Sequence, residues 1–329
     1  MAKGEPGVRA PDFWQANGIW PRLLSPIAAV YGWAARQHQL AAQPWRAPLP
    51  VLSVGNLVVG GAGKTPVTLS LAERLSGRGR APHLLSRGYG GRARGPLRVD
   101  PVRHDAAQVG DEPLLLAATA PTWVARDRTA GTRAAIAAGA DVLVLDDGHQ
   151  NQALAKDLAL VIVDGTQAFG NRRLLPAGPL RESITDGLAR ATAVVLLGED
   201  VSGLSDELAG TLPLLTGRLE PKKNTLRGKV VVAFAGIGRP QKFFATLDGM
   251  DCEVLGRHTF SDHHPYHEHE ILMLLDKATK LDALLVTTAK DRVRLPPHLQ
   301  DLVEVVEVMV VWDNETALEA LLEELDNDD

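Results

Sequence analysis

Glycines, a lysine and a threonine gather in the run 53–66, where together they could hold a nucleoside polyphosphate. The apolar segment 49–52 before the run predicts a strand, and 67–72 after it predicts a helix. Glycines let backbone N–H groups converge on phosphates, Lys64 could reach the β- and γ-phosphates, and the Thr65 hydroxyl could bind Mg²⁺. The sequence therefore predicts a phosphate-binding loop between a strand and a helix.

One position departs from the usual phosphate-loop pattern G-x-x-x-x-G-K-[ST]. Val58 stands where that pattern has its first glycine. The alternative is a glycine-rich turn that happens to precede Lys64 and Thr65. The order strand, loop, helix favours the phosphate loop, because the helix N-terminus would add partial positive charge at the same place.

Two adjacent carboxylates, Asp146 and Asp147, follow the apolar run 142–145. A carboxylate at the carboxyl end of a parallel strand can reach an Mg²⁺ ion held by a phosphate loop. The alternative is a plain Asp-Asp-Gly turn, since these residues are common in turns. Together with the loop, the metal site is the favoured interpretation.

Asp111 opens an expected helix over 111–118. Carboxylates at a helix start commonly satisfy free backbone N–H groups, and from its position alone this capping role is favoured for Asp111.

The segment 257–270 holds five of the ten histidines of the chain. His263 and His267 are four residues apart, which would allow a zinc site, but Pro265 lies between them and no cysteine is near. A loop that brings one imidazole into a cleft between domains, where it accepts or relays a proton, is favoured instead.

The N-terminal segment carries four of the six tryptophans and a basic, amphipathic pattern over 13–35. Its apolar residues recur at helical spacing. They are Trp20, Leu23, Leu24, Ile27, Val30 and Tyr31. Such a face could lie on an anionic membrane or pack on the protein's own core, and patterning alone favours the core.

Alternating apolar runs and helical patterns make an α/β fold with a parallel sheet the expected class. The polar stretch 220–224 suggests a linker, so we expect an N-terminal helical segment (1–45), a nucleotide-binding domain (46–220) and a C-terminal α/β domain (221–329). A net charge of −5 argues against a general nucleic-acid binder. A single cysteine excludes an internal disulfide framework and is typical of a reducing compartment.

Several of these runs together resemble the tetraacyldisaccharide 4′-kinases, which phosphorylate the lipid A precursor of Gram-negative bacteria, and the resemblance covers nearly the whole chain. The runs that carry it are SVGNL (53–57), GGAGKTP (60–66), LSRGYG (85–90), VGDEP (109–113), LDDGHQ (145–150), LPAGPLRE (175–182), AGIG (235–238) and FSDHH (260–264). The family's phosphate loop also lacks the first glycine, which accounts for Val58.

The resemblance implies a P-loop NTPase-like α/β/α sandwich and a second, smaller α/β/α domain joined to it by a β hinge. It also implies an N-terminal amphipathic helix on the cytoplasmic face of the inner membrane, to which the protein would bind peripherally. The implied activity uses ATP and Mg²⁺ to phosphorylate the 4′-hydroxyl of a tetraacylated glucosamine disaccharide 1-phosphate, giving lipid IVA. Neither a nucleic acid nor an obligatory protein partner is expected.

Roles for individual residues also follow from the resemblance. It implies that Asp111 is the catalytic carboxylate and His263 its partner in a dyad, which replaces the capping role favoured by position alone. It implies that Lys64 and Arg128 are catalytic as well, and that Tyr89 lies at the same site. The implied metal ligands are Thr65, Asp146 and Asp147. The implied nucleotide-binding residues are Gly60, Gly61, Ala62, Gly63, Lys64, Thr65 and Pro66.

Two positions depart from the family pattern. Asn151 stands where the family usually has histidine, and Ala289 stands where it has glutamate in a Thr-Glu-Lys-Asp run. A glutamate role at 289 is therefore not carried over, whereas Lys290 is retained. Two other functions would use the same loop: a nucleotide-switch chaperone, and a ligase-type enzyme acting on a soluble acid. Only the kinase would make a phosphorylated lipid.

Overall fold

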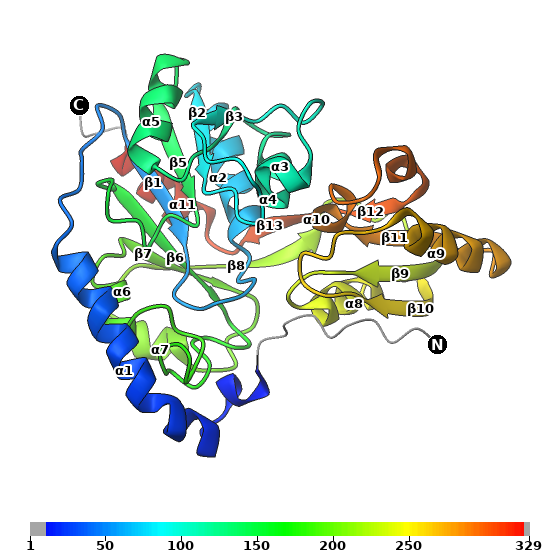
Figure 1. The fold of residues 1–329 in the computed structure, drawn as a ribbon, viewed down its shortest axis with the longest axis horizontal. Coiled ribbons are helices and arrows are strands. Elements are labelled where there is room, and N and C mark those ends of the chain that lie inside the picture. Colours follow the sequence, from blue (N-terminus) through cyan, green and yellow to red (C-terminus); the bar gives the residue numbers. More distant parts are fainter. Residues whose placement is uncertain (1–10, 326–329) are drawn as a thin grey trace.

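The computed structural model describes residues 11–325, so the first ten residues of the expected 1–45 segment lie outside it. Two α/β bodies of unequal size lie side by side, and one long helix lies along the outside of the larger body (Figure 1). The helices are η1 (Asp12–Gln15), α1 (Ile19–Leu40), α2 (Lys64–Gly77), α3 (Ala106–Val109), α4 (Asp111–Leu116), α5 (Arg128–Ala137), α6 (Ile184–Leu188), α7 (Leu204–Leu208), α8 (Pro240–Asp248), α9 (Glu268–Lys280), α10 (Ala289–Arg292), η2 (Pro297–Leu302) and α11 (Glu315–Glu324). The strands are β1 (Val51–Gly55), β2 (Pro82–Ser86), β3 (Leu97–Arg98), β4 (Thr122–Val124), β5 (Val142–Asp146), β6 (Leu158–Asp164), β7 (Ala193–Leu197), β8 (Leu214–Pro221), β9 (Val230–Ala235), β10 (Glu253–Thr259), β11 (Leu284–Thr288), β12 (Glu304–Val306) and β13 (Val308–Trp312).

The larger body is built on a nine-stranded sheet with the order β13-β8-β7-β6-β1-β5-β2-β4-β3. Its inner strands pair in parallel, and only the two edge strands, β13 and β3, pair antiparallel. Every residue of β1, β5, β6 and β7 is buried, because helices cover both faces of the sheet. Such strands are rich in Val and Leu, which explains the unbroken apolar runs in the sequence. The expected α/β class with a parallel sheet is confirmed.

Side chains that alternate along the strands pack into one hydrophobic cluster on one face of the sheet and two on the other. Leu52 and Val54 of β1 pack with α2 and α11 on one face. Residues of β2 and β5 on the other face pack with α5, and those of β6 and β7 pack near α6 and α7. The carboxyl ends of β1, β5 and β6 therefore meet at one edge, where parallel sheets usually bind ligands.

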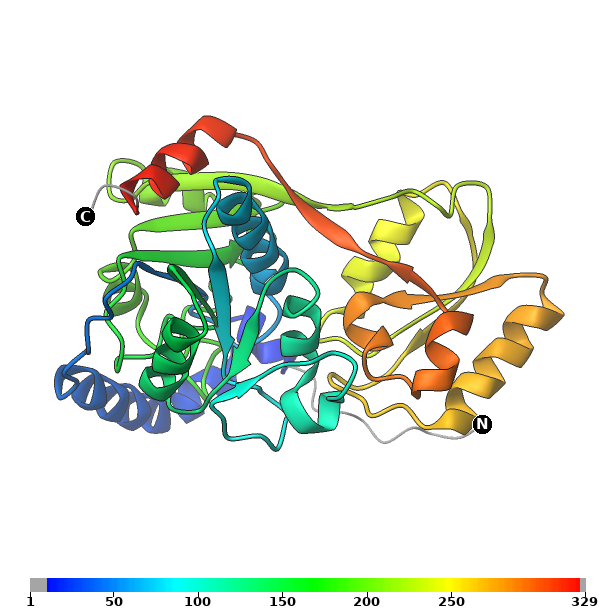
Figure 2. The same cartoon turned by 90° about the horizontal axis from the view of Figure 1, so that it is seen from above.

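The smaller body is a parallel four-stranded sheet with the order β10-β9-β11-β12. Alternate residues of β9 face opposite sides: Val231 and Ala233 pack with α8, whereas Val232 and Phe234 pack with α9. Figure 2 shows this body beside the larger one, with long strands running between the two.

The two bodies are joined by β8 and β13, which pair antiparallel from Val308 opposite Pro221 to Trp312 opposite Gly217. The sequence pattern over 305–312 predicts one strand, but the structure divides this run between the two sheets, because β12 pairs with β11 and β13 pairs with β8. The chain thus returns to the larger body, and α11 packs into its core. The range 221–329 expected for the second domain differs from the structure at this end.

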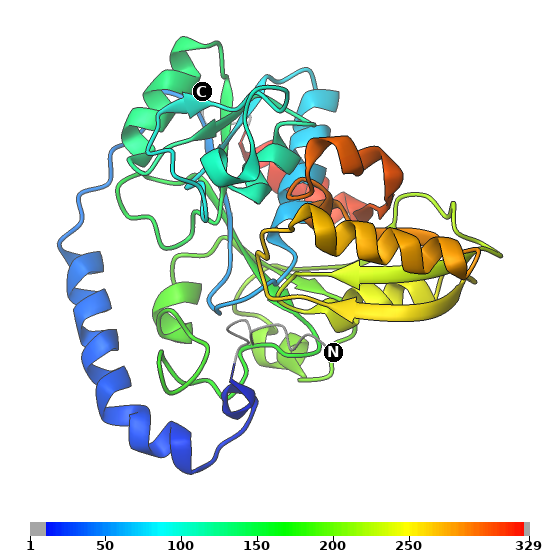
Figure 3. The same ribbon diagram turned by 45° about the vertical axis from the view of Figure 1, so that its right-hand side comes forward.

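Helix α1 lies apart from both cores, and only Pro21 and Ala28 on it are buried. Its apolar residues point outward: Trp20 is 61% exposed, Leu23 61% and Ile27 57%. The core packing favoured by patterning alone is therefore wrong for this face. Figure 3 shows the helix running along one side of the molecule. Among residues 11–325, no helix combines the length and apolarity needed to cross a bilayer.

Candidate active site

The phosphate-loop candidate lies where β1 ends and α2 begins, at the centre of the large sheet. Gly60 and Gly63 both have positive φ, 120° and 92°. Side chains are strained in this region, so glycine is required for the loop to turn into the helix here. The loop thus presents the first turn of α2, with Lys64 and Thr65 as its first residues, to the edge of the sheet.

Lys64 is held near the acidic pair at the end of β5. Its Nζ donates to Asn56 Oδ1 over 3.2 Å and lies 3.5 Å from Asp147 Oδ1. Arg181 donates to the same carboxylate, with Nη1 3.0 Å from Oδ2. Burial raises the pKa of Asp147, but the charges of Lys64 and Arg181 outweigh it and hold that pKa below its ordinary value.

Asp146 has a different environment, although it is the next residue. It is 1% exposed, Thr68 donates to its Oδ1 over 3.2 Å, and its Oδ2 has no partner among the described residues. Burial first, and then the charges of Glu112 and Asp147, raise its pKa to about 7. A buried carboxyl oxygen without a partner, close to further carboxylates, fits a hard cation such as Mg²⁺.

The structure therefore separates the two candidate metal ligands. Asp147 already pairs with two cationic side chains, whereas Asp146 Oδ2 has no hydrogen-bond partner among the described residues. Within residues 11–325, no three His, Cys, Asp or Glu side chains form a cluster that could hold a metal by themselves. An Mg²⁺ ion here would need other oxygens, such as the Thr65 hydroxyl, phosphates and water.

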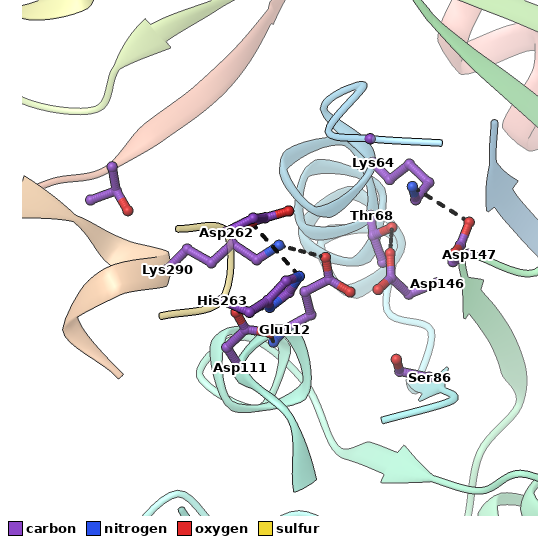
Figure 4. Close-up of polar contacts among 12 residues, drawn as sticks. Lys64, Thr68, Ser86, Asp111, Glu112, Asp146, Asp147, Asp262, His263 and Lys290 are labelled. Carbon is purple, nitrogen blue, oxygen red and sulfur yellow. Dashed lines mark hydrogen bonds and ion pairs between the residues drawn. The ribbon is translucent and has the colours of Figure 1, made fainter. Parts of the chain in front are cut away.

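A carboxylate–imidazole pair forms across the two bodies. His263 lies in the loop between β10 and α9 of the smaller body, and Asp111 begins α4 of the larger one. His263 Nδ1 lies 2.9 Å from Asp111 Oδ2. In Figure 4, His263 and Lys290 reach toward Asp111 and Glu112, with Asp146 beyond them. The two residues, 152 apart in sequence, are thus brought into hydrogen-bond contact.

Backbone geometry fixes both members of this pair. Gly110, before Asp111, has φ 91°, and a side chain there would place its Cβ 2.5 Å from the Tyr89 carbonyl oxygen. His263 has φ 56°, a left-handed conformation that is uncommon for histidine. Strained backbone of this kind persists where surrounding structure enforces it, often at functional sites. The Tyr89 ring centroid lies 5.4 Å from that of His263.

Cations of the smaller body surround the Asp111 carboxylate. Arg294 Nε lies 3.6 Å from its Oδ2, and Lys290 pairs with the neighbouring Glu112 over 2.8 Å. Burial raises the pKa of Asp111, but the hydrogen bond with His263 and the charges of Lys290 and Arg294 together lower it to about 2. Because folding lowers this pKa, the ionised carboxylate stabilises the folded protein above about pH 4, and that contribution is lost as the pH falls toward 2.

Replacing Lys290 with methionine should raise the pKa of Asp111, because one of the charges that favour its ionised form is removed. A carbon-13 NMR titration of the Asp111 carboxyl measures this directly. The exposed Lys280 on α9 provides the control, since among residues 11–325 its ammonium pairs with Asp276 alone. An unchanged titration in Lys290→Met would show that this lysine does not act on Asp111.

Arg128 begins α5 and is buried, at 4% exposure. Its Nη1 donates to the Ala125 carbonyl, and its Nε has no partner among the described residues. Burial, with the nearby charge of Arg87, lowers its pKa to about 10, while the charges of Asp147 and Asp146 oppose that shift. A buried guanidinium with an unused donor beside the acidic pair is suited to an anion.

A pocket of about 400 Å³ lies beside these residues, where α1 meets the larger body. Its lining residues are Tyr31, Ala35, His38, Gln39, Val59, Arg87, Gln150, Leu175 and Arg181. Arg181 connects it to the acidic pair, because the same guanidinium bonds Asp147. The pocket is thus lined on one side by α1 and is linked to the acidic pair through Arg181.

The structure brings Lys64, Asp146 and Asp147 together, and it places Asp111 and His263 in contact. Thr65 and Pro66 lie in the first turn of α2, but the structure bonds Thr68, not Thr65, to Asp146. Sequence reasoning gave no role to Arg181 and only a helix-capping role to Glu112, and it left that of Lys290 open. Arg181 and Glu112 lie inside runs 175–182 and 109–113, so those runs were the available signal.

The similarity to known proteins covers almost the whole chain. A family model described as tetraacyldisaccharide-1-P 4′-kinase matches residues 20–326. A tetraacyldisaccharide 4′-kinase of Rhodospirillum centenum is 55% identical over 323 residues, covering 96% of each chain. That of Rhodospirillum rubrum is 54% identical over 325 residues, covering 97% of this chain and 98% of the relative.

A solved structure is similar over nearly the same extent. The crystal structure of LpxK from Aquifex aeolicus in complex with ATP gives a TM-score of 0.76 at 26% identity. The match covers 93% of this chain and 99% of that one.

Proposed function

This chain belongs to the tetraacyldisaccharide 4′-kinase family, and from that premise we propose how its site performs the family's reaction. The protein transfers the γ-phosphoryl group of ATP to the 4′-hydroxyl of a tetraacylated glucosamine disaccharide 1-phosphate. The observation that carries the assignment of roles is the contact between Asp111 and His263 beside the phosphate loop. The loop alone would also allow a nucleotide-switch chaperone. That alternative is not favoured, because these relatives are all named as kinases.

Asp111 accepts the proton of the attacking hydroxyl. With a pKa of about 2 it stays ionised at neutral pH and is a weak base, so it takes the proton as the new P–O bond forms rather than before. His263, hydrogen-bonded to Oδ2, keeps the carboxylate in place and can pass the proton on. Its position on the smaller body makes this pair dependent on contact between the two bodies.

Lys64 and Arg128 stabilise the charge on the transferring phosphoryl group. Asp146, with its spare oxygen, is the carboxylate that would hold Mg²⁺, together with the Thr65 hydroxyl. When bound, the ion neutralises charge on the β- and γ-phosphate oxygens. Asp147 instead keeps Lys64 and Arg181 in position.

Contact between the bodies also protects the reaction from water. The imidazole of His263 and the ammonium of Lys290 come from the smaller body, whereas the phosphate loop belongs to the larger one. A site completed by closure excludes the water that would otherwise hydrolyse ATP.

The pocket between α1 and the larger body would receive the sugar of the lipid acceptor. It is lined by Tyr31 and His38 of α1 and by Arg87 and Arg181. Guanidinium groups suit the phosphate that the acceptor already carries. The acyl chains would follow the exposed apolar face of α1 into the membrane.

A labelled-product assay tests the proposed reaction. Purified protein is incubated with radiolabelled ATP and the disaccharide lipid in detergent, and the products are separated. A labelled lipid supports the kinase. Label found only in inorganic phosphate, with or without a protein partner, would contradict it.

We also propose that α1 holds the protein on the cytoplasmic face of the inner membrane. Replacing Ile27 with aspartate, in the middle of the exposed apolar face, should strongly reduce co-sedimentation with anionic vesicles, because a buried charge opposes insertion. Leu302→Asp is the matched control, since Leu302 is also 58% exposed but lies on the smaller body. Equal loss in both variants, or none in Ile27→Asp, would contradict the proposal.

A further inference from the structure

The smaller body touches the phosphate loop directly, through the turn between β9 and α8. This turn contains Gly236, Ile237, Gly238 and Arg239. A side chain at Gly238 would place its Cβ 4.0 Å from the Gly61 backbone nitrogen and 3.3 Å from Asp262 Oδ2. The turn thus packs against the loop at van der Waals distance, and its Gly236 carbonyl oxygen also accepts from the His263 backbone nitrogen over 3.1 Å.

Arg239 binds two groups of the larger body at once. Its Nη2 donates to the Gly61 carbonyl oxygen over 2.7 Å and lies 2.5 Å from Asp164 Oδ2. Asp164 is the last residue of β6, the strand beside β1, and it is 3% exposed. One guanidinium therefore connects the smaller body, the phosphate loop and the end of a central strand.

The Asp164 carboxylate is itself fixed by its neighbours. Its Oδ1 accepts hydrogen bonds from the Thr166 backbone nitrogen over 3.0 Å and from the Thr166 hydroxyl over 2.6 Å. This leaves Oδ2 for Arg239 and for Lys242, which pairs with the same oxygen from the first turns of α8. A buried, oriented carboxylate is a firm anchor for a planar guanidinium, which can bond two acceptors in fixed directions.

Holding the Gly61 carbonyl constrains the loop. In a trans peptide the C=O and the following N–H point in opposite directions, so a Gly61 carbonyl turned toward Arg239 turns the Ala62 N–H away from the smaller body. Glycine-rich loops have many accessible backbone conformations, and fixing one of them costs free energy. Arg239 supplies part of that constraint only while the two bodies are in contact.

We propose that Arg239, anchored by Asp164, is a positioning residue that couples closure of the smaller body to the phosphate-binding shape of the loop. Closure then prepares the loop for the nucleotide, and a bound nucleotide favours closure in return, because coupling between two events is reciprocal. The inference rests on the proposed function to the extent that the loop binds ATP.

The structure offers a matched control in Lys242. It pairs with the same carboxylate oxygen from α8, three residues after Arg239, but it makes no hydrogen bond or ion pair with the loop among the described residues. Arg239→Ala should weaken binding of a non-hydrolysable ATP analogue by roughly 10- to 100-fold, the range expected for a hydrogen bond from a charged donor. Lys242→Ala should weaken it by less than about threefold, within the range of an exposed ion pair.

Isothermal titration calorimetry measures these affinities without any lipid, so a failure of the kinase assignment leaves this test intact. Inter-domain fluorescence energy transfer should show that the analogue closes the parent protein and Lys242→Ala but closes Arg239→Ala less. Asp164→Asn, which removes the anchoring charge, should resemble Arg239→Ala in both measurements. Thermal unfolding of each variant checks that it is folded.

Three results would overturn the proposal. Unchanged analogue affinity in Arg239→Ala would remove the link to the loop. An equal loss of analogue affinity in Arg239→Ala and Lys242→Ala would mean that the contact holds the two bodies together without acting on the loop. A transfer rate at saturating ATP that falls 100-fold or more in Arg239→Ala, with affinity unchanged, would mean that the guanidinium acts on the transferring phosphoryl group itself.

Discussion

Replacing Asp111 with asparagine should lower the rate of phosphoryl transfer by about 10²- to 10⁴-fold, the usual contribution of a positioned general base. The change removes the negative charge and the ability to accept a proton, while the shape of the side chain is kept. Asp111 belongs to α4 and is not part of the phosphate loop, so the affinity for ATP should stay close to that of the parent. Steady-state kinetics with the lipid acceptor, and calorimetry with an ATP analogue, measure the two quantities separately.

Asp105→Asn separates this role from simple helix capping. Asp105 caps the neighbouring helix α3, where its side chain accepts from the Gln108 backbone nitrogen. Asp111 also accepts a local bond, from the Glu112 nitrogen over 2.9 Å. If capping were its only task, both variants would lose stability and keep their transfer rate. Retained transfer in Asp111→Asn would therefore refute its assignment as the base.

Replacing Lys64 with alanine should reduce both ATP affinity and transfer, the latter by roughly 10²- to 10³-fold, as for the loss of one preorganised donor to developing charge. The Lys64 side chain is only 10% exposed and lies beside Asp147, so no other described lysine is placed to replace it. Without it, Arg181 remains paired with Asp147, but the ammonium that would face the phosphates is lost.

Lys222→Ala is the control for this variant, because Lys222 is a half-exposed lysine whose ammonium lies 3.8 Å from Glu73. It should retain wild-type kinetics. A Lys64→Ala protein that bound and turned over nucleotide as well as the parent would show that this loop does not bind the phosphates.

Local patterns predicted the elements of the larger body well. Runs such as 142–145 and 158–163 are apolar on both faces, and this is the mark of central parallel strands. The phosphate loop and the acidic pair could be connected from sequence, because both follow strands whose carboxyl ends meet at one edge. Their proximity follows from parallel topology and needs no side-chain detail.

Contacts between the bodies could not be predicted from spacing. Asp111 and His263 are far apart in the chain, and only a family resemblance joined them, since position alone favoured a capping role for Asp111. The resemblance retained Lys290 but gave it no partner, and it gave Arg239 no role, because nothing local distinguishes a cation that faces another domain from one that faces water. The division of 305–312 between β12 and β13 was missed for a related reason: both halves have strand-like residues, and tertiary pairing decides which sheet each half joins.

The outward face of α1 shows a further limit of patterning. An amphipathic pattern gives the apolar side of a helix but not what that side contacts. In the structure the inner side is marked by Pro21, Ala28 and Gly32, where a Cβ on Gly32 would meet Leu174 at 2.4 Å. Small residues thus let the helix approach the body, and the large apolar ones remain for another surface.

The most direct test of the central claim is the position of the new phosphate on the lipid. Phosphorus–proton correlation NMR of the product made from ATP and the disaccharide 1-phosphate reports which sugar proton is coupled to each phosphorus. The account predicts a second phosphate resonance coupled to the proton at position 4′. ADP that accumulates without that resonance, or a phosphate coupled to a different proton, would contradict it.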